Sequence, residues 1–429
     1  MLDDIFAQSL KIAIRQPRYF QVVPVIVEVE ESVPLDPITS KVLRTLQIDV
    51  SQTIRYMNMF SMTLPTALLP DLASIDYVKR IYLNREHYAL EAPFNPLDPL
   101  GLFRKLPTPM DIKDKIFGTP AGWIPTAEAL KATNVYELHN RGIKGEGVKL
   151  FVLDTGGDIS HPQLDTRLRG TYTQTIGSPH DGNGHGTHCA STAGGSYWRH
   201  PVTKLEMLGV APECDLYTIK VLTDIGSGDT ASIMRAIEQA VSMGADVISM
   251  SLGSSGAEDE EDDPMVKMIN KIGETHPEVV FCIAAGNSGP QEKTVGIPAI
   301  ADNCIAVGAY DIKKRDVALF SSRGPTTQLG KTRPHILAPG VDIYSGLALG
   351  SILDYVDRMP NQASPLSGTS MATPHLAGIA ALWKQMVRDL TVQDFIRTFK
   401  AMSDMPQSND WGYGLADATW ILNITGVGA

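Results

Sequence analysis

The first ninety residues alternate short apolar strands with amphipathic helical segments. The stretch "VVPVIVEVE" is continuous enough to be a buried strand, whereas "ITSKVLRTLQI" carries its apolar residues at helical spacing. The order of elements is typical of the split β-α-β arrangement of a small α+β, ferredoxin-like domain. The predicted elements are strands over 22–30, 54–64 and 77–83 and helices over 38–48 and 70–75.

After residue 122 the pattern changes to longer apolar strands, each ending in small polar residues, such as "VKLFVLDTG" and "EVVFCIAAGNSG". An amphipathic helix, "TASIMRAIEQAVSMG", lies between two of them. Buried strands alternating with helices predict a doubly wound, mostly parallel α/β sheet. In such sheets ligands bind beyond the carboxyl ends of the strands, where Asp154, Ser251 and Asn287 fall.

The segment between these two parts is rich in proline and has no periodicity, which is typical of a linker. We therefore divide the chain into an N-terminal extension (1–17), the α+β domain (18–90), the linker (91–122) and the α/β domain (123–429).

Composition narrows the choice of function. With 43% hydrophobic and 20% charged residues the chain is typical of a globular protein, and a net charge of −11 argues against nucleic acid as a partner. We find no apolar run long enough for a bilayer and no signal-peptide core in the first twenty residues, so we expect no membrane partner and a cytoplasmic location. The four cysteines lack the CxxC spacing, and we expect buried thiols without a disulfide framework.

The segment "LSGTSMATPHLAGIAALWKQMV" predicts a helix that begins near Ser370. Pro374 fits only near the first turn of a helix, which places Ser370 beside unpaired backbone N–H groups and the positive end of the helix dipole. Both features favour an oxyanion beside this serine.

A serine hydroxyl needs a base, and the base needs a third group that fixes its tautomer. His185 lies in a glycine-rich entry to a helix, "DGNGHGTHCAS", and Asp154 ends an apolar strand. Asn287 ends another strand with an amide that can donate to an oxyanion. Together with Ser370 these residues make a coherent site for acyl transfer.

The blocks "VLDTG", "NGHGTHCA", "SMSLG", "AAGNSGP" and "SGTSMATPH" resemble the signature segments of the subtilisin-like serine proteases, in the same order. "YLNRE" and "FSSRGPT" look closer still to the intracellular AprX-type subtilases. The resemblance implies that Asp154 orients His185, that His185 is the general base and that Ser370 attacks. Asn287 and the backbone N–H of Ser370 would hold the oxyanion, and the fold would be subtilisin-like.

The resemblance also implies how a substrate binds and how the enzyme is made. An extended peptide would lie between two edges by β-strand addition. The α+β domain resembles a propeptide that inhibits its own enzyme, with self-cleavage near Leu90 and room for a second cut near Gly118. The implied substrate-binding residues are Gly226, Ser227, Gly228, Ser251, Leu252, Gly253, Ala285 and Gly286.

Other interpretations stay open at this point. The chain could be a catalytically silent, peptide-binding or chaperone-like homologue, while an α/β-hydrolase esterase would need a GxSxG elbow that Ser370 lacks. His185 and His188 could bind zinc, but no third ligand accompanies them, and Cys189 is a weaker candidate nucleophile than Ser370. The acidic run 258–263 is expected to be a solvated loop, or else to attract basic substrate residues or a cation.

The expected chemistry needs no cofactor. The strong calcium site of the extracellular relatives uses an aspartate where this chain has Gln163, and an Asn-rich loop where it has "SYWRHPVTKLEM". A structural calcium ion would therefore need another site built from carboxylates and carbonyls, and its place is unknown.

Overall fold

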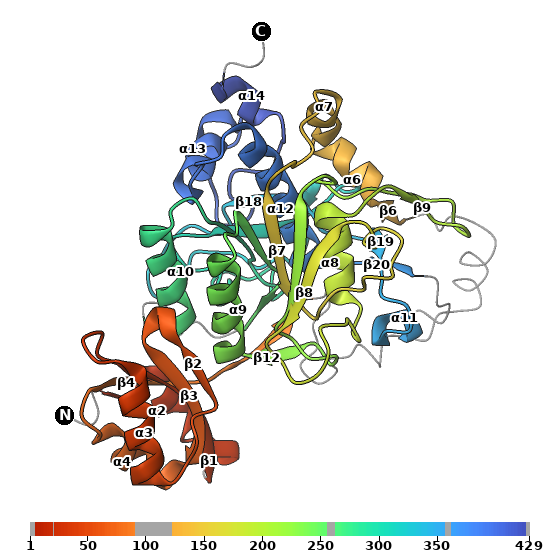
Figure 1. Cartoon of the computed structure of the whole chain (residues 1–429). Coiled ribbons are helices and arrows are strands. Elements are labelled where there is room, and N and C mark those ends of the chain that lie inside the picture. The colour runs from red at the N-terminus through yellow and green to blue at the C-terminus, as the bar shows by residue number, and fades with distance from the viewer. Residues whose placement is uncertain (1–4, 20, 91–121, 255–261, 357–361, 426–429) are drawn as a thin grey trace.

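The computed structural model describes residues 5–19, 21–90, 122–254, 262–356 and 362–425. They form a small N-terminal α+β domain and a larger α/β domain, and the small domain lies against the ends of two helices of the larger one (Figure 1). Most of the predicted linker, the start of the acidic run and the second predicted cut near Gly118 lie outside the described residues. Within the described residues, no helix combines the length and the apolar character needed to cross a bilayer.

The small domain is built on a four-stranded antiparallel sheet with the order β2-β3-β1-β4. Two findings differ from the sequence prediction. The single strand predicted over 54–64 is interrupted, because Asn58 adopts a left-handed conformation (φ 52°) after a 3-10 turn. Helix α3 begins earlier than predicted and ends at Leu46, before Gln47, which is also left-handed. The elements are β1 (Val22–Val29), α3 (Leu35–Leu46), β2 (Gln52–Ile54), β3 (Met59–Pro65), α4 (Leu69–Ala73) and β4 (Val78–Leu83).

The segment 1–17, predicted to be an N-terminal extension, contributes to this domain. Helix α2 (Gln8–Ala13) buries Leu10 and Ala13 in the small domain's core. The backbone N–H of Ala7 donates to Ile81 O (2.9 Å) on the edge strand β4. The core of the small domain therefore begins before residue 18.

The larger domain is a doubly wound sheet, as predicted, with the order β17-β16-β15-β13-β7-β11-β8 and β18 beside β16. All pairings are parallel except that of β17 with β16. Its strands are β7 (Lys149–Asp154), β8 (Leu168–Thr173), β11 (Asp215–Lys220), β13 (Val247–Met250), β15 (Val280–Ala284), β16 (Ile305–Asp311), β17 (Asp316–Val317) and β18 (Ile336–Pro339).

Helices cover both faces of this sheet, which explains why its strands are apolar without alternation. In β7, Leu150 and Val152 pack into the cluster that contains residues of α8 (His185–Gly194) and α12 (Thr369–Met386). Phe151 and Leu153 point to the opposite face, into the cluster under α9 (Thr230–Ser242) and α10 (Pro264–Thr275).

The remaining elements lie at the periphery. Trp123, at the start of the larger domain, stacks on the fully buried Tyr344 with ring centroids 5.0 Å apart. The four cysteines are buried and free, so the prediction that no disulfide forms is confirmed. The peripheral elements are β6 (Ile124–Pro125), α6 (Thr126–Ala132), α7 (Val135–Asn140), β9 (Trp198–Arg199), β10 (Glu206–Met207), β19 (Ile343–Gly346), α11 (Ile352–Val356), β20 (Ala363–Leu366), α13 (Val392–Met402) and α14 (Trp420–Thr425).

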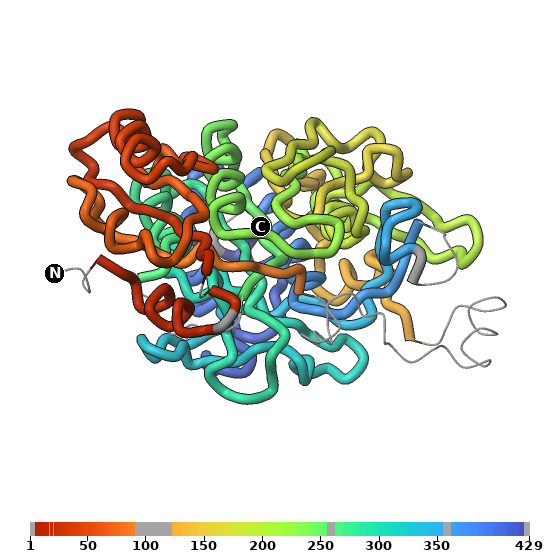
Figure 2. Tube along the Cα trace, turned by 90° about the horizontal axis from the view of Figure 1, so that it is seen from below, coloured from red at the N-terminus to blue at the C-terminus, as the bar shows by residue number. Residues whose placement is uncertain are grey.

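The small domain docks on α9 and α10 through a shared apolar cluster, to which it contributes Ile26, Ile54 and Met59, and through polar contacts. The backbone N–H of Tyr56 donates to the Glu238 carboxylate of α9 (2.7 Å), and Lys271 of α10 pairs with Glu31 (2.8 Å). From this position the chain continues as β5 (Glu86–Ala89), the orange segment that crosses the face of the larger domain in Figure 2.

Candidate active site

Asp154 and His185 are brought together by the carboxyl end of β7 and the first residue of α8. The Nδ1 atom of His185 lies 2.6 Å from Oδ1 of Asp154, and both side chains are fully buried. The same oxygen accepts a hydrogen bond from the backbone N–H of Thr155 (2.7 Å). Burial lowers the pKa of His185, but the Asp154 carboxylate outweighs it and holds the pKa well above the usual 6.5.

The loop before His185 is organised by Asp181, which the sequence analysis missed. Its carboxylate accepts hydrogen bonds from the hydroxyl of Thr155 (2.8 Å) and from the backbone N–H (2.7 Å) and hydroxyl (2.7 Å) of Thr187, in the first turn of α8. A buried carboxylate at the positive end of a helix is favourable. One feature of the sequence could have indicated this role: Asp181 stands four residues before His185, where an aspartate can cap the start of α8.

Ser370 is the second residue of α12, close to the helix start that the sequence predicts. Pro374 has no N–H, so the carbonyl of Ser370 lacks its partner in the helix. The Ser251 hydroxyl (2.9 Å) and the Cys189 thiol (3.5 Å) donate to this carbonyl instead. The proline thereby ties α12 to the end of β13 and to α8.

The Ser370 hydroxyl itself donates to Ser251 O (3.0 Å). Nε2 of His185 is buried and has no hydrogen-bond partner among the residues described here. The two groups therefore belong to one buried cluster, but the serine hydroxyl bonds to Ser251 O and not to the histidine in this structure.

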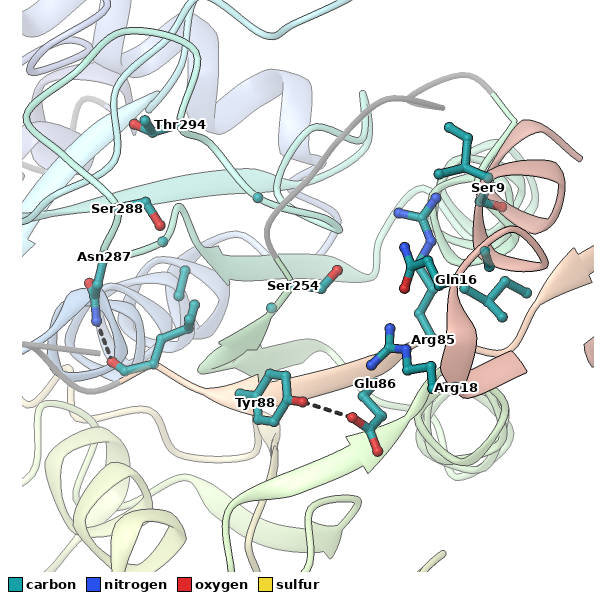
Figure 3. Close-up of a pocket in the computed structure, with 18 of the residues that line it drawn as sticks. Ser9, Gln16, Arg18, Arg85, Glu86, Tyr88, Ser254, Asn287, Ser288 and Thr294 are labelled. Atoms are coloured by element: carbon teal, nitrogen blue, oxygen red, sulfur yellow. Dashed lines mark hydrogen bonds between the residues drawn. The ribbon is translucent and has the colours of Figure 1, made fainter. Parts of the chain in front are cut away.

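Asn287 has its amide oriented by the residue before Ser370. Its Oδ1 accepts from the backbone N–H and from the hydroxyl of Thr369, each at 2.9 Å. This arrangement leaves Nδ2 free to point at the carbonyl of Leu90, to which it donates at 2.7 Å (Figure 3). A fixed N–H donor aimed at a carbonyl oxygen is the geometry that stabilises an oxyanion.

Leu90 reaches this position because β5 is the middle strand of a small antiparallel sheet. One neighbour is β12 (Ser227–Asp229) and the other is β14 (Leu252–Gly253). The chain adds two further bonds, from Ala89 N to Gly226 O (2.9 Å) and from Leu90 N to Ser251 O (3.4 Å). Both edges that the sequence analysis proposed for peptide binding are thus paired with the chain's own segment.

A cavity of about 480 Å³ opens beside this segment, between the larger domain and the N-terminal helix α2 (Figure 3). Leu90 lines it together with residues that have little or no side chain, among them Gly253, Ala284 and Gly286. Ala285 is among the residues that the resemblance assigns to substrate binding. It is buried directly after β15, and its backbone N–H donates to Val307 O (2.9 Å).

Comparison with known proteins agrees with this geometry. The sequence model of the Subtilase family matches residues 145–414, more than half of the chain. The chain belongs to the subtilase family. Its members include serine proteases, so this subtilase is a subtilisin-like serine protease by family.

Three relatives show how far the similarity extends. The subtilase is 34% identical to the serine protease AprX of Bacillus subtilis, over 82% of this chain and 76% of that protein. It is 39% identical to a thermostable alkaline protease of Halalkalibacterium halodurans, over 58% and 60% of the two chains. With subtilisin E of Bacillus subtilis it shares 38% identity over 57% of each chain.

The structure removes the zinc pair considered for this subtilase. His188 is fully buried and its Nε2 contacts the carbonyl oxygens of Ile343 (2.9 Å) and Ser364 (3.2 Å), so Nε2 is not available to a metal ion shared with His185. Burial lowers the pKa of His188 to about 3 and raises that of the Cys189 thiol to about 11. A neutral thiol is a poor nucleophile, which leaves Ser370 as the better candidate.

At the position where the extracellular relatives bind calcium, this chain has the amide Gln163 in place of an aspartate. The Gln163 amide donates to Ser196 O (3.3 Å), and Ser196 donates its backbone N–H to Gln163 O (2.9 Å). Calcium prefers carboxylate and free carbonyl oxygens, but here the two loops bond to each other. Of the acidic run, the described Asp262 pairs with Arg80 and with Lys267 (2.9 Å), and Asp263 caps α10.

Proposed function

We propose that this subtilase is a serine endopeptidase made as a proenzyme, which cleaves its own chain between Leu90 and Glu91. Asp154, His185 and Ser370 form the catalytic triad, and Asn287 with the backbone N–H of Ser370 forms the oxyanion hole. The observation that carries the proposal is the 2.7 Å hydrogen bond from Asn287 to the carbonyl of Leu90.

The chemistry follows from the positions of the side chains. The Ser370 hydroxyl turns from Ser251 O toward Nε2 of His185, which accepts its proton as Oγ attacks the carbonyl carbon of Leu90. Asp154 holds Nδ1–H of His185, which fixes the tautomer and favours the imidazolium. His185 then protonates the leaving nitrogen, and water hydrolyses the acyl-enzyme by the same steps in reverse order.

The small domain acts as an intramolecular inhibitor in this proposal. β5 occupies the peptide-binding edges, and the contacts with α9 and α10 hold the domain in place after cleavage. Other peptides and proteins are substrates once it leaves. That the enzyme works in the cytoplasm stays a prediction from sequence.

The test compares the purified wild type with Ser370→Ala by intact mass and N-terminal sequencing, together with hydrolysis of a chromogenic peptide that ends in Leu. We expect the wild type to begin at Glu91 or later and to cleave the peptide, and the variant to stay full length. A serine-directed phosphonate should label Ser370. An inactive, unlabelled wild type would instead support the silent peptide-binding homologue.

A further inference from the structure

A buried lysine holds the turn that leads into β12, one of the two strands that pair with β5. The turn comprises residues 223–226, and the carbonyl of its last residue, Gly226, accepts from the backbone N–H of Ala89. Lys220, at the end of β11, is only 3% exposed, and its ammonium group donates to Oδ1 of Asp224 within the turn (2.8 Å). A lysine is rarely buried this completely unless it is paired. The ion pair therefore fixes the turn to the end of β11.

The same ammonium group reaches the strand that carries Asp154. Lys220 lies opposite Asp154 in the register of β11 and β7, and its Nζ also donates to the carbonyl oxygen of Thr155. The backbone N–H of Thr155 donates to the Asp154 carboxylate (2.7 Å), and its hydroxyl accepts from the backbone N–H of Gly186 in α8 (2.8 Å). Thr155 is thereby bonded to Asp154, to the first turn of α8 and to Lys220.

A second set of bonds joins the turn to the loop before His185. The carbonyl of Asp224 accepts from Nδ2 of Asn183 (2.9 Å), and Oδ1 of Asn183 accepts from the backbone N–H of His185 (3.2 Å). The neighbouring Gly182 has to be a glycine, because a Cβ atom at this residue would clash with the carboxyl group of Asp224. One glycine of the loop before His185 therefore makes room for the carboxylate that pairs with Lys220.

We propose that Lys220 is a positioning residue that keeps the turn 223–226 in register with Asp154 and His185. The proposal rests on the proposed function, since it treats β5 as a bound substrate. Hydrogen bonds between a long peptide and this edge raise kcat only if the edge keeps a fixed position relative to the catalytic groups, because the binding energy then holds the scissile carbonyl in place. Lys220 supplies that fixed position by acting through Thr155 and Asp224.

The experiment compares two leucine p-nitroanilides on the purified full chain after self-cleavage, with active enzyme counted by phosphonate labelling of Ser370. Glu-His-Tyr-Ala-Leu-p-nitroanilide copies residues 86–90 and reaches the turn, whereas acetyl-Leu-p-nitroanilide does not. For the wild type we expect the longer substrate to have the higher kcat. In Lys220→Met the ratio of the two kcat values should fall about tenfold, the effect of losing one charge-assisted hydrogen bond. The kcat of the short substrate should stay within about threefold of wild type, because Asp154 and His185 keep their other hydrogen bonds.

Two further variants keep the test decisive if Lys220→Met folds poorly. Asp224→Asn changes a side chain that is 59% exposed, so the chain should fold, and it should lower the same kcat ratio about threefold. Lys384→Met is the matched control, because Lys384 is a fully buried lysine that donates to the carbonyls of Glu278 (2.6 Å) and Leu390 (3.0 Å) instead of to the turn. It should change both kcat values by the same factor.

The outcomes separate this inference from the proposed function. A kcat ratio that is unchanged in Lys220→Met and Asp224→Asn, or a loss confined to KM, would overturn the inference and leave the proposed function standing. Equal kcat values of the wild type for the two substrates, or an equal fall of both in Lys220→Met, would do the same, since Lys220 would then have a structural role only. Hydrolysis of neither substrate by the wild type would overturn both.

Discussion

Replacing Asn287 by alanine tests the oxyanion hole directly. The wild-type side chain donates one hydrogen bond, to the carbonyl of Leu90, and accepts two from Thr369. Toward a neutral carbonyl the lost donor is worth about 1 kcal/mol, or roughly fivefold in binding. Toward a charged tetrahedral intermediate it is worth about 2.7–4 kcal/mol, the range known for loss of the corresponding donor in subtilisin itself.

We therefore expect kcat to fall about a hundred- to a thousandfold in Asn287→Ala, while KM rises by no more than roughly fivefold. The assay is steady-state hydrolysis of a chromogenic leucine peptide, with active enzyme counted by phosphonate labelling of Ser370. Thr369→Val is the matched control, because it keeps the Asn287 donor and one of its two anchors, and should lose only about fivefold in kcat. A kcat for Asn287→Ala within tenfold of wild type, or a loss confined to KM, would refute the assignment.

Three further predictions test other parts of the site and fold. The pKa of His185 is raised above 6.5, and only the neutral ring accepts a proton. The rate of peptide hydrolysis should therefore fall as pH is lowered, with its acid midpoint above pH 6.5. A midpoint below about pH 6 would contradict this prediction. Leu90→Asp should slow self-cleavage roughly ten- to a hundredfold in a mass-spectrometric time course, since it puts a charged side chain in place of an apolar one beside Gly253, Ala284 and Gly286, while Leu90→Met should not. Tyr344→Ala, made in the Ser370→Ala background to prevent self-cleavage, should lower the free energy of unfolding in urea by about 3–5 kcal/mol, because it removes one ring of a buried aromatic stack. A loss under about 1 kcal/mol would argue against a stabilising role of this stack.

The sequence was most informative where structure depends on neighbouring residues. Continuous apolar runs predicted the parallel sheet, and the residues at their ends predicted where Asp154 and Asn287 lie. Pro374 indicated the start of α12 correctly, but the sequence does not show which groups bond to the Ser370 carbonyl that this proline leaves without a helical partner. The carbonyl that it frees is bonded by Ser251 and Cys189, which are more than 100 residues away in the chain.

Contacts between distant segments account for the other differences. Helix α2 has no sequence signal that ties it to the edge of β4, so it was assigned to an extension although Leu10 and Ala13 are core residues. In the sequence Asp181 is a polar residue of a glycine-rich loop with no visible role. Its role depends on a hydrogen bond from Thr155, which directly follows β7. Such contacts depend on side-chain placement, which hydrophobic periodicity does not determine.

Under the proposed function, one binding mode of the docked segment β5 would serve both self-cleavage and inhibition. β5 satisfies the backbone groups of β12 and β14 on both sides, so a second peptide cannot pair with either edge while it remains. Before cleavage its effective concentration is that of an intramolecular ligand, which is high because the small domain is held against α9 and α10. Cutting after Leu90 leaves every one of these hydrogen bonds intact but frees the new chain end of the larger domain. Release then becomes an ordinary dissociation, so we expect activity to appear later than cleavage and the active fraction at equilibrium to rise on dilution.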